Sequence, residues 1–141
     1  MSDMYNLRII AAARVFYEGP CLSLIVPAFD GEKEVLAHHE SMVIAVTDGE
    51  MRYKTEDGTW HIGYVGRGFV QIANNRVILL TESAEKPEEI DVRRAEEAKE
   101  RALEQLRQKQ SIQEYYHSSA SLARAMARLK TSRQTAGKIR I

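Results

Sequence analysis

The chain has 141 residues, of which 44% are hydrophobic and 28% are charged, with 20 basic and 20 acidic residues. This composition is ordinary for a soluble globular protein, and no apolar run approaches the ~18 residues that a membrane-spanning helix needs. The single cysteine, Cys21, excludes an internal disulfide. Residues 1–86 hold 8 Lys/Arg and 12 Asp/Glu, whereas residues 87–141 hold 12 Lys/Arg and 8 Asp/Glu. The two parts are therefore expected to differ in structure and in partners.

The first part, residues 1–86, has short apolar and β-branched runs separated by turn signals. The expected strands are residues 5–11, 15–17, 22–27, 34–37, 42–46, 50–54, 60–64, 69–73 and 77–81. Asp-Gly at 57–58 and Asn-Asn at 74–75 each lie between two such runs and predict hairpins. Residues 18–20, Glu-Gly-Pro, predict a turn after the second run. About nine or ten short strands with close turns indicate an antiparallel β-sandwich or a flattened barrel.

Signatures of catalysis and of metal binding are missing from this part. No G-x-x-x-x-G-K-[ST] phosphate loop is present. The adjacent His38 and His39 point to opposite faces of a strand, so they do not chelate one ion together. Cys21 is expected to be a small apolar filler of the core. The sequence therefore predicts no metal site and no enzyme that acts alone.

The second part, residues 87–141, consists mainly of strong helix formers. Pro87 suits the first turn of a helix, and residues 90–109 predict a helix with a thin Ala/Leu stripe. Ser111 is a possible N-cap for a second Ala-rich helix, expected to end near Ser132. The predicted fold class is therefore α+β in two parts: an N-terminal antiparallel β-sandwich and a C-terminal antiparallel α-helical hairpin. Thin apolar stripes give such a hairpin little stability of its own, so we expect it to leave the sandwich at small cost.

Charged residues at helical spacing are placed to converge when the hairpin closes. Asp91, Arg94 and Arg101 share one face of the first helix, and Arg124 and Arg128 share one face of the second. Closing the hairpin brings these residues toward Glu85 near the seam between the two parts. Guanidinium groups match phosphate oxygens in bidentate geometry. Taken alone, however, the pattern fits surface ion pairs of about 0.5 kcal/mol each better than a ligand site.

The end of the chain is basic, with six basic residues and no acidic residue from Tyr115 onward. Such a helix suits an acidic protein, a phosphate ligand or nucleic acid, but it is also typical of a solubilising tail. Tyr115 and Tyr116 precede the basic run and do not alternate with it, so they form no stacking platform for single-stranded nucleic acid.

The motif Ile90-Asp91-x-x-Arg94-Ala95 stands between the predicted sandwich and the Ala-rich hairpin. This order resembles the epsilon subunit of bacterial F-type ATP synthase. Further matches in the family's order are Gly31-Glu32, His39, Gly68-Phe69, the strand at 77–80, and Ala84-Glu85. The chain departs from the family pattern at residues 33–35, 38–42 and 66–68, mostly toward the loop that in the family faces the membrane rotor ring.

The resemblance implies a non-catalytic subunit of the rotating central stalk, at the cytoplasmic face of the bacterial membrane. Residues 1–86 hold the gamma subunit and contact the c-ring in such proteins, and Gly31, Glu32 and His39 are the positions expected to face the ring. Residues 87–141 form the regulatory hairpin. When the hairpin is extended, its basic second helix contacts acidic segments of the catalytic β subunits, next to the α subunits, and blocks ATP hydrolysis. Residues implied in that contact are Arg124, Arg128, Lys130 and Arg133.

Some bacterial members bind ATP between hairpin and sandwich, which favours the folded state. The positions that match this site are Glu85, Ile90, Asp91, Arg94, Ala95, Arg101, Arg124 and Arg128. With the resemblance added to the charge pattern, ATP becomes the favoured regulatory ligand, and the need for Mg²⁺ stays open. The alternative is a basic helical adaptor that binds nucleic acid or an acidic protein. A stand-alone enzyme is the third and weakest hypothesis.

Overall fold

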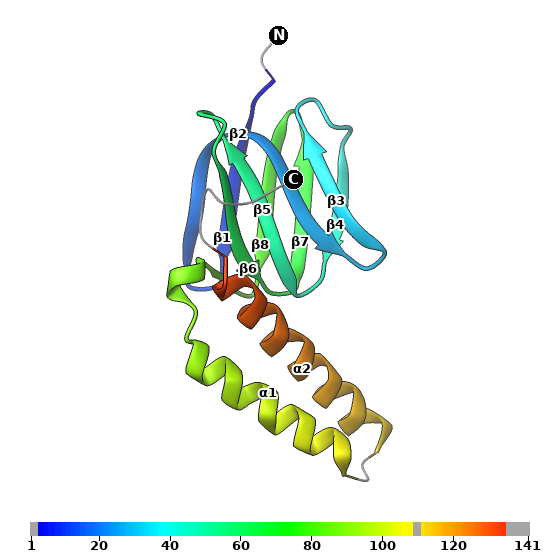
Figure 1. The fold of residues 1–141 in the computed structure, drawn as a ribbon. Coiled ribbons are helices and arrows are strands. Elements are labelled where there is room, and N and C mark those ends of the chain that lie inside the picture. The colour runs from blue at the N-terminus through cyan, green and yellow to red at the C-terminus, as the bar shows by residue number, and fades with distance from the viewer. Residues whose placement is uncertain (1–2, 109–110, 135–141) are drawn as a thin grey trace.

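The computed structural model describes residues 3–108 and 111–134, and it consists of a folded β-sheet followed by two helices (Figure 1). The strands are β1 (Tyr5–Ala11), β2 (Arg14–Ala28), β3 (Gly31–Leu36), β4 (Met42–Val46), β5 (Gly49–Thr55), β6 (Trp60–Val65), β7 (Gly68–Ala73), β8 (Arg76–Thr81) and β9 (Ala84–Glu85). The helices are the short 3₁₀ helix η1 (Pro87–Glu89), α1 (Val92–Arg107) and α2 (Ile112–Ser132). The predicted α+β fold, a sandwich followed by a helical hairpin, is confirmed.

One continuous hydrogen-bonded path joins the strands in the order β4-β7-β8-β1-β2-β5-β6-β9, with β3 paired to β2. The strand β2 connects the two layers of the sandwich. Its first half pairs with β1, where Tyr17 lies opposite Ile9, and its second half pairs with β3 and β5, where Ile25 lies opposite Arg52. All pairings are antiparallel except β1 with β8, which is parallel.

The turn predicted at residues 18–20 was wrong, because β2 runs without interruption through the two strands predicted at 15–17 and 22–27. Glu18, Gly19 and Pro20 lie opposite Arg8, Leu7 and Asn6 of β1. The other neighbour, β5, joins the ladder only from Cys21 onward. At position 20, β2 therefore has no pairing with β5 that would need the N–H that proline lacks. The proline is tolerated within the strand for this reason.

The core lies between the two layers and follows the alternation of the strands. Tyr5, Leu7, Ile9 and Ala11 of β1 are all buried, while the intervening side chains are more exposed. Cys21 is buried in the same cluster, as predicted. At the turn of the β7–β8 hairpin, Asn74 and Asn75 have φ of 52° and 57°. Asn tolerates this left-handed region, which a tight two-residue hairpin turn requires at both positions.

The first helix begins at Val92 and not at Ile90, where it was predicted. Pro87 opens the separate turn η1, and the side chain of Asp91 caps α1 by accepting a hydrogen bond from the backbone N–H of Arg94 at 3.0 Å. An N-cap has extended backbone, so the preceding residues cannot be part of the same helix. The predicted N-cap of α2 is confirmed, since the Glu114 N–H donates to Ser111 Oγ at 3.2 Å.

The hairpin is antiparallel, and small side chains line its seam. Ala95 and Ala102 of α1 and Ala125 of α2 are buried, which lets the helices approach closely. Figure 1 shows the hairpin extending from one end of the sandwich, with the C-terminal turns of α2 nearest the strands. There α2 packs against β5 and β6 and buries Leu129 and Thr131. In the described part of the chain, no helix is long and apolar enough to cross a membrane.

Candidate functional site

A cavity of about 490 Å³ lies between α1, α2 and β9. Its charged lining residues are Glu85, Asp91, Arg94, Arg101, Arg124 and Arg128. Its other lining residues are Ala95, Ala98, Ala102, Gln105, His117, Ser121 and Ala125. All six charged residues that the sequence placed together are therefore brought together, although their numbers range from 85 to 128.

Helical periodicity explains how the cavity is built. On α1 the lining residues recur every three or four positions from Asp91 to Gln105, and on α2 they recur from His117 to Arg128 in the same way. The alanines leave space between the helices, and the longer polar side chains surround that space. The two-residue strand β9 contributes Glu85 through its pairing with Tyr64 of β6.

Arg128 is the cavity residue with the most extensive contacts. Its Nε donates to Glu85 Oε2 at 2.9 Å, with Oε1 at 3.3 Å, and both side chains are partly buried. Its guanidinium carbon lies 4.3 Å from the centroid of the Tyr64 ring, within the range of a cation–π interaction. Burial raises the pKa of Tyr64 to about 12, and the nearby Arg128 charge opposes that rise. Arg128 thus joins α2 to two strands of the sandwich.

The other arginines of the cavity have uncompensated charge. Within the described residues, Arg94, Arg101 and Arg124 form no ion pair, and Arg124 donates only to the neutral Ser121 hydroxyl, at 3.1 Å. Four arginines and two carboxylates give the lining a formal charge of +2. Guanidinium groups without a carboxylate partner favour an anion in the cavity, and their fork geometry suits phosphate.

Ile90 and Arg93 lie near the site but do not line the cavity. Ile90 is buried between η1 and α1, so its place in the motif is a packing position. The side chain of Arg93 is 88% exposed and pairs with Glu97 on the outer surface of α1 at 3.2 Å. The two adjacent arginines 93 and 94 therefore have different environments, which makes them a matched pair for mutation.

The cavity also contains Gln105, His117 and Ser121, which were not predicted. Gln105 stands four residues after Arg101, Ser121 three residues before Arg124, and His117 four residues before Ser121. Extending the helical spacing by one turn on each helix would have found them. Polar residues of this kind are common on solvated helix faces, so the spacing alone gave no reason to select them.

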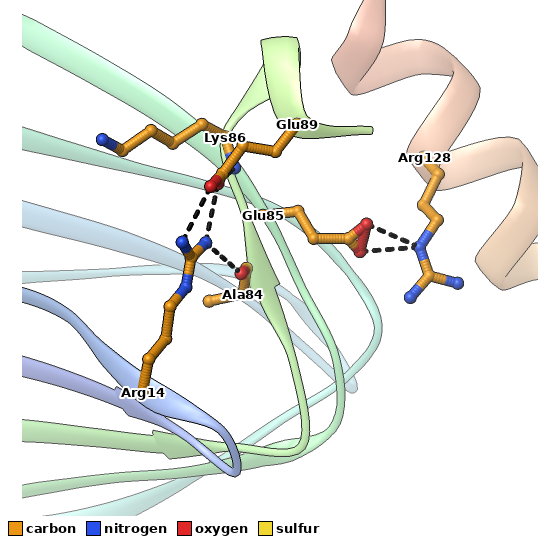
Figure 2. Close-up of polar contacts among 6 residues, drawn as sticks. All are labelled: Arg14, Ala84, Glu85, Lys86, Glu89 and Arg128. Atoms are coloured by element: carbon orange, nitrogen blue, oxygen red, sulfur yellow. Dashed lines mark hydrogen bonds and ion pairs between the residues drawn. The ribbon is translucent and has the colours of Figure 1, made fainter. Parts of the chain in front are cut away.

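A second polar cluster, missed by the sequence analysis, holds the linker between sandwich and hairpin (Figure 2). Arg14 donates from Nη1 and Nη2 to the two carboxylate oxygens of Glu89 at 2.7 and 2.6 Å, and Nη2 also donates to the Ala84 carbonyl at 3.1 Å. The Lys86 N–H donates to the same carboxylate at 2.7 Å. Hydrogen bonding from Arg14 lowers the pKa of Glu89 to about 2, so this carboxylate stays charged at neutral pH. We call these contacts of Arg14 with Glu89 and Ala84 the linker anchor.

The remaining predicted positions are dispersed over the structure. Gly31 and Glu32 begin β3, and Glu32 pairs with Arg52 at 2.9 Å. His39 follows the other end of β3, so these three residues do not lie in one loop, and their contact with the ring stays a prediction. Lys130 is exposed and Arg133 is the C-cap of α2, whereas Lys138 and Arg140 of the basic tail lie outside the described residues. No group of three or more potential metal ligands occurs in the part of the chain that the structure describes.

One face of the sandwich has apolar side chains that no other described part of the chain covers. Val43, Phe69 and Leu80 are 63%, 57% and 45% exposed. Leu80 lies opposite Phe69 of β7 and, on its other side, opposite Ile10 of β1. The neighbouring residues Val70 and Leu79 point into the core. Phe69, Leu80 and Ile10 therefore form an apolar row across β7, β8 and β1. Exposed apolar side chains grouped on one face are typical of surfaces that bind partners.

Comparison with known proteins gives consistent matches along the chain. Residues 4–87 match the family model "ATP synthase, Delta/Epsilon chain, beta-sandwich domain", and residues 88–133 match "ATP synthase, Delta/Epsilon chain, long alpha-helix domain". The ATP synthase epsilon chain of Ruminiclostridium cellulolyticum is 42% identical over 128 residues, which is 91% of this chain and 95% of the relative. The ATP synthase epsilon chain of Caldanaerobacter subterraneus subsp. tengcongensis is 38% identical over 130 residues. The match covers 92% of this chain and 94% of the relative.

Solved structures support the fold. A chain of the Euglena gracilis mitochondrial ATP synthase, from the structure of OSCP, F1 and c-ring, superposes with a TM-score of 0.81. It is 20% identical, and the match covers 95% of this chain and 84% of that one. A chain from the central stalk and c-ring of the Tetrahymena thermophila enzyme gives a TM-score of 0.67 at 8% identity, covering 90% and 95% of the two chains.

Proposed function

The chain belongs to the family of ATP synthase epsilon chains, subunits of the central stalk, and we propose that its helical hairpin controls ATP hydrolysis in response to bound ATP. The observation that carries this proposal is the cavity between α1, α2 and β9, with its four arginines. The sandwich acts as the holder of the gamma subunit and the contact to the c-ring. We further propose that the subunit acts at the cytoplasmic face of the bacterial membrane.

The cavity fits a nucleoside triphosphate in size and chemistry. Its volume of about 490 Å³ lies within the ~300–1,000 Å³ usual for small-molecule sites. Arg94, Arg101 and Arg124 supply the charge for the phosphates. Asp91 uses one carboxylate oxygen for the Arg94 N–H, which leaves the other free to accept from an amino group such as that of adenine.

Binding at this place favours the closed hairpin. The cavity exists only while α1, α2 and β9 are in contact, so a ligand that contacts all three has higher affinity for the docked state. A ligand shifts a conformational equilibrium through such a difference in affinity. The same arginines, Arg124 and Arg128, are the ones expected to contact the β subunit. In the docked state they line the cavity, so ATP binding and the inhibitory contact exclude one another.

The docked hairpin is only weakly stabilised, which makes it suitable for a switch. Three of the buried residues of its two helices are alanines, Ala95, Ala102 and Ala125, which contribute little buried area. Within the described residues, the buried Tyr64 hydroxyl and Thr131 Oγ have no hydrogen-bond partner. Each such group costs about 1–3 kcal/mol. These costs offset part of the gain from burying Leu129, so a ligand of ordinary affinity is sufficient to shift the equilibrium.

ATP is expected to slow hydrogen exchange of the α1 and α2 amides in the isolated protein. At a concentration 100 times the dissociation constant, a ligand stabilises its state by about 2.7 kcal/mol, so exchange through undocking slows about 100-fold. Amides of β7 and β8, away from the cavity, serve as the internal control and should be unaffected. Unchanged exchange of both helices at saturating ATP would argue against the proposed coupling.

We propose the uncovered face of β4, β7, β8 and β1 as the surface that binds gamma. Phe69→Asp is expected to weaken binding to the isolated gamma subunit by about 10- to 100-fold, because burying such a side chain contributes about 1.5–3 kcal/mol. Phe29→Asp is a matched control, since Phe29 is 95% exposed at the β2–β3 turn and not on this face. Surface plasmon resonance measures both. Equal affinities of the two variants would rule this face out.

A further inference from the structure

The linker between sandwich and hairpin carries two ion pairs on its opposite sides (Figure 2). On one side is the linker anchor, in which Arg14 binds Glu89 and the Ala84 carbonyl. On the other side, Glu85 binds Arg128 of α2. The Arg14–Glu89 pair joins the linker to the sandwich, whereas the Glu85–Arg128 pair joins it to the hairpin.

The linker anchor joins the linker to the sandwich and involves neither α1 nor α2. Arg14 is the first residue of β2, and its guanidinium carbon also lies 5.3 Å from the ring centroid of Phe16. Its partners are in β9 and η1. Lys86 lies between these two elements, and its N–H donates a further hydrogen bond to the Glu89 carboxylate. Pro87 in the same turn is buried. The short helix η1 contacts α2 as well as β6, but none of the hydrogen bonds of the linker anchor is made to α1 or α2.

The Arg128–Glu85 pair, in contrast, joins the sandwich to the hairpin. Undocking α2 breaks this pair and the Arg128–Tyr64 stacking, but it does not require any bond of the linker anchor to break. Between the anchored Glu89 and the first residue of α1 stand only Ile90 and Asp91. Both have extended backbone, with φ, ψ of −74°, 125° and −78°, 95°, and they belong to neither helix.

We propose that Arg14 is a positioning residue that keeps the linker on the sandwich in both states of the hairpin, so that the hairpin pivots at Ile90–Asp91. Arg14 also keeps Glu85 in place, because it binds the carbonyl of Ala84 beside it. A two-residue strand such as β9 has few ladder bonds of its own, so this contact matters for the register of Glu85 with Tyr64. The inference rests on the proposed function, since it concerns the movement that the function requires.

Crosslinks on the two sides of the linker test where the pivot lies. Two variants of the assembled enzyme are made, one with Cys at positions 14 and 89 and one with Cys at positions 85 and 128. A short bis-maleimide then joins the two cysteines of each variant. A bis-maleimide is used because it reaches further than a disulfide, and long Arg and Glu side chains span both pairs. Because Arg128 is itself expected to contact the β subunit, linking 85 to 128 is compared with the same variant before crosslinking, and it is expected to hold the hairpin docked and to abolish the inhibition that the unlinked variant retains. Linking 14 to 89 is expected to leave inhibition unchanged.

The outcomes separate the two ideas. If both crosslinks abolish inhibition, the linker must leave the sandwich during extension, and the pivot inference is wrong while the proposed function stands. If the 85–128 crosslink leaves inhibition unchanged, the mobile inhibitory hairpin is wrong, and the pivot with it.

A second measurement tests Arg14 without a crosslink. Arg14→Ala is expected to speed hydrogen exchange of the amides of residues 85–90 at least tenfold, while core amides of β1 are unchanged. The charge-swapped double variant Arg14→Glu with Glu89→Arg should restore slow exchange only in part, because it re-forms the ion pair but not the bonds to the Ala84 carbonyl and from the Lys86 N–H. Arg8→Ala, which removes another exposed Arg–Glu pair of 2.8 Å far from the linker, is the control. Linker exchange that is equal in Arg14→Ala and Arg8→Ala would overturn the inference.

Discussion

Arg94→Ala is expected to weaken ATP binding by the isolated protein about 10- to 100-fold, while Arg93→Ala leaves it unchanged. Arg94 lines the cavity and has no ion-pair partner among the described residues, whereas Arg93 is on the outer surface of α1 and pairs with Glu97. A hydrogen bond to a charged group contributes about 1.5–3 kcal/mol, which corresponds to this range of affinity. The measurement is a calorimetric titration with ATP, with ADP and GTP for comparison, in the presence and absence of Mg²⁺.

The two arginines are adjacent, equal in charge and on the same helix, so any effect of net charge or helix propensity is common to both variants. A difference between them therefore reports the contact with the nucleotide. The N-cap of α1 uses the backbone N–H of Arg94 and the side chain of Asp91, so Arg94→Ala keeps the cap and the helix start. Equal losses in both variants would indicate general electrostatic attraction. Absence of binding by the unmodified protein up to millimolar ATP would remove the nucleotide proposal.

The fold was largely predictable from the sequence because most strands and both helices have strong local signals. Asn74-Asn75 between two alternating runs specified a hairpin, and Ser111 specified the start of α2, as the structure confirms. The error at residues 18–20 has a physical reason. Gly and Pro are turn signals locally, but in β2 they occupy a stretch with a ladder partner on one side, where their backbone is tolerated. That partner, β1, is defined only by the tertiary structure.

The candidate site was predictable in part, and the limit is again set by distance along the chain. Arg94 and Arg101 on α1, and Arg124 and Arg128 on α2, follow helical spacing, so the face that each pair shares on its own helix is visible in the sequence. Arg14 is 75 residues from Glu89, and no spacing rule connects them. The start of α1 was misplaced by two residues because Ile90 continues the apolar pattern, while the cap formed by Asp91 ends it.

An enzyme assembled with an epsilon chain that ends at Ile90 is expected to hydrolyse ATP at least about fivefold faster than one with the full chain. Allosteric coupling free energies of about 1–3 kcal/mol correspond to a factor of roughly 5–150 in an equilibrium constant. The lower end of that range is used as the expected shift from inhibited to active enzyme, because the truncation removes the whole proposed inhibitory element. The cut is placed after Ile90 because the linker anchor and the cap of η1 by the Ile90 N–H are then retained. The measurement is steady-state ATPase activity, with the amount of bound epsilon chain determined on the same preparation.

A matched variant distinguishes loss of the inhibitory contact from loss of the helices themselves. Replacing Lys130 and Arg133 with Gln keeps both helices and all cavity residues, since neither side chain lines the cavity. If the basic end of α2 contacts acidic segments of the β subunits, this variant should be activated as well, though less than the truncation, and it should respond to ATP like the unmodified chain. Charge complementarity of this kind steers and orients an association more than it determines affinity, so the activation should shrink at high salt. Hydrolysis that is unchanged in the truncated form, with epsilon still bound, would mean that the hairpin does not inhibit the enzyme.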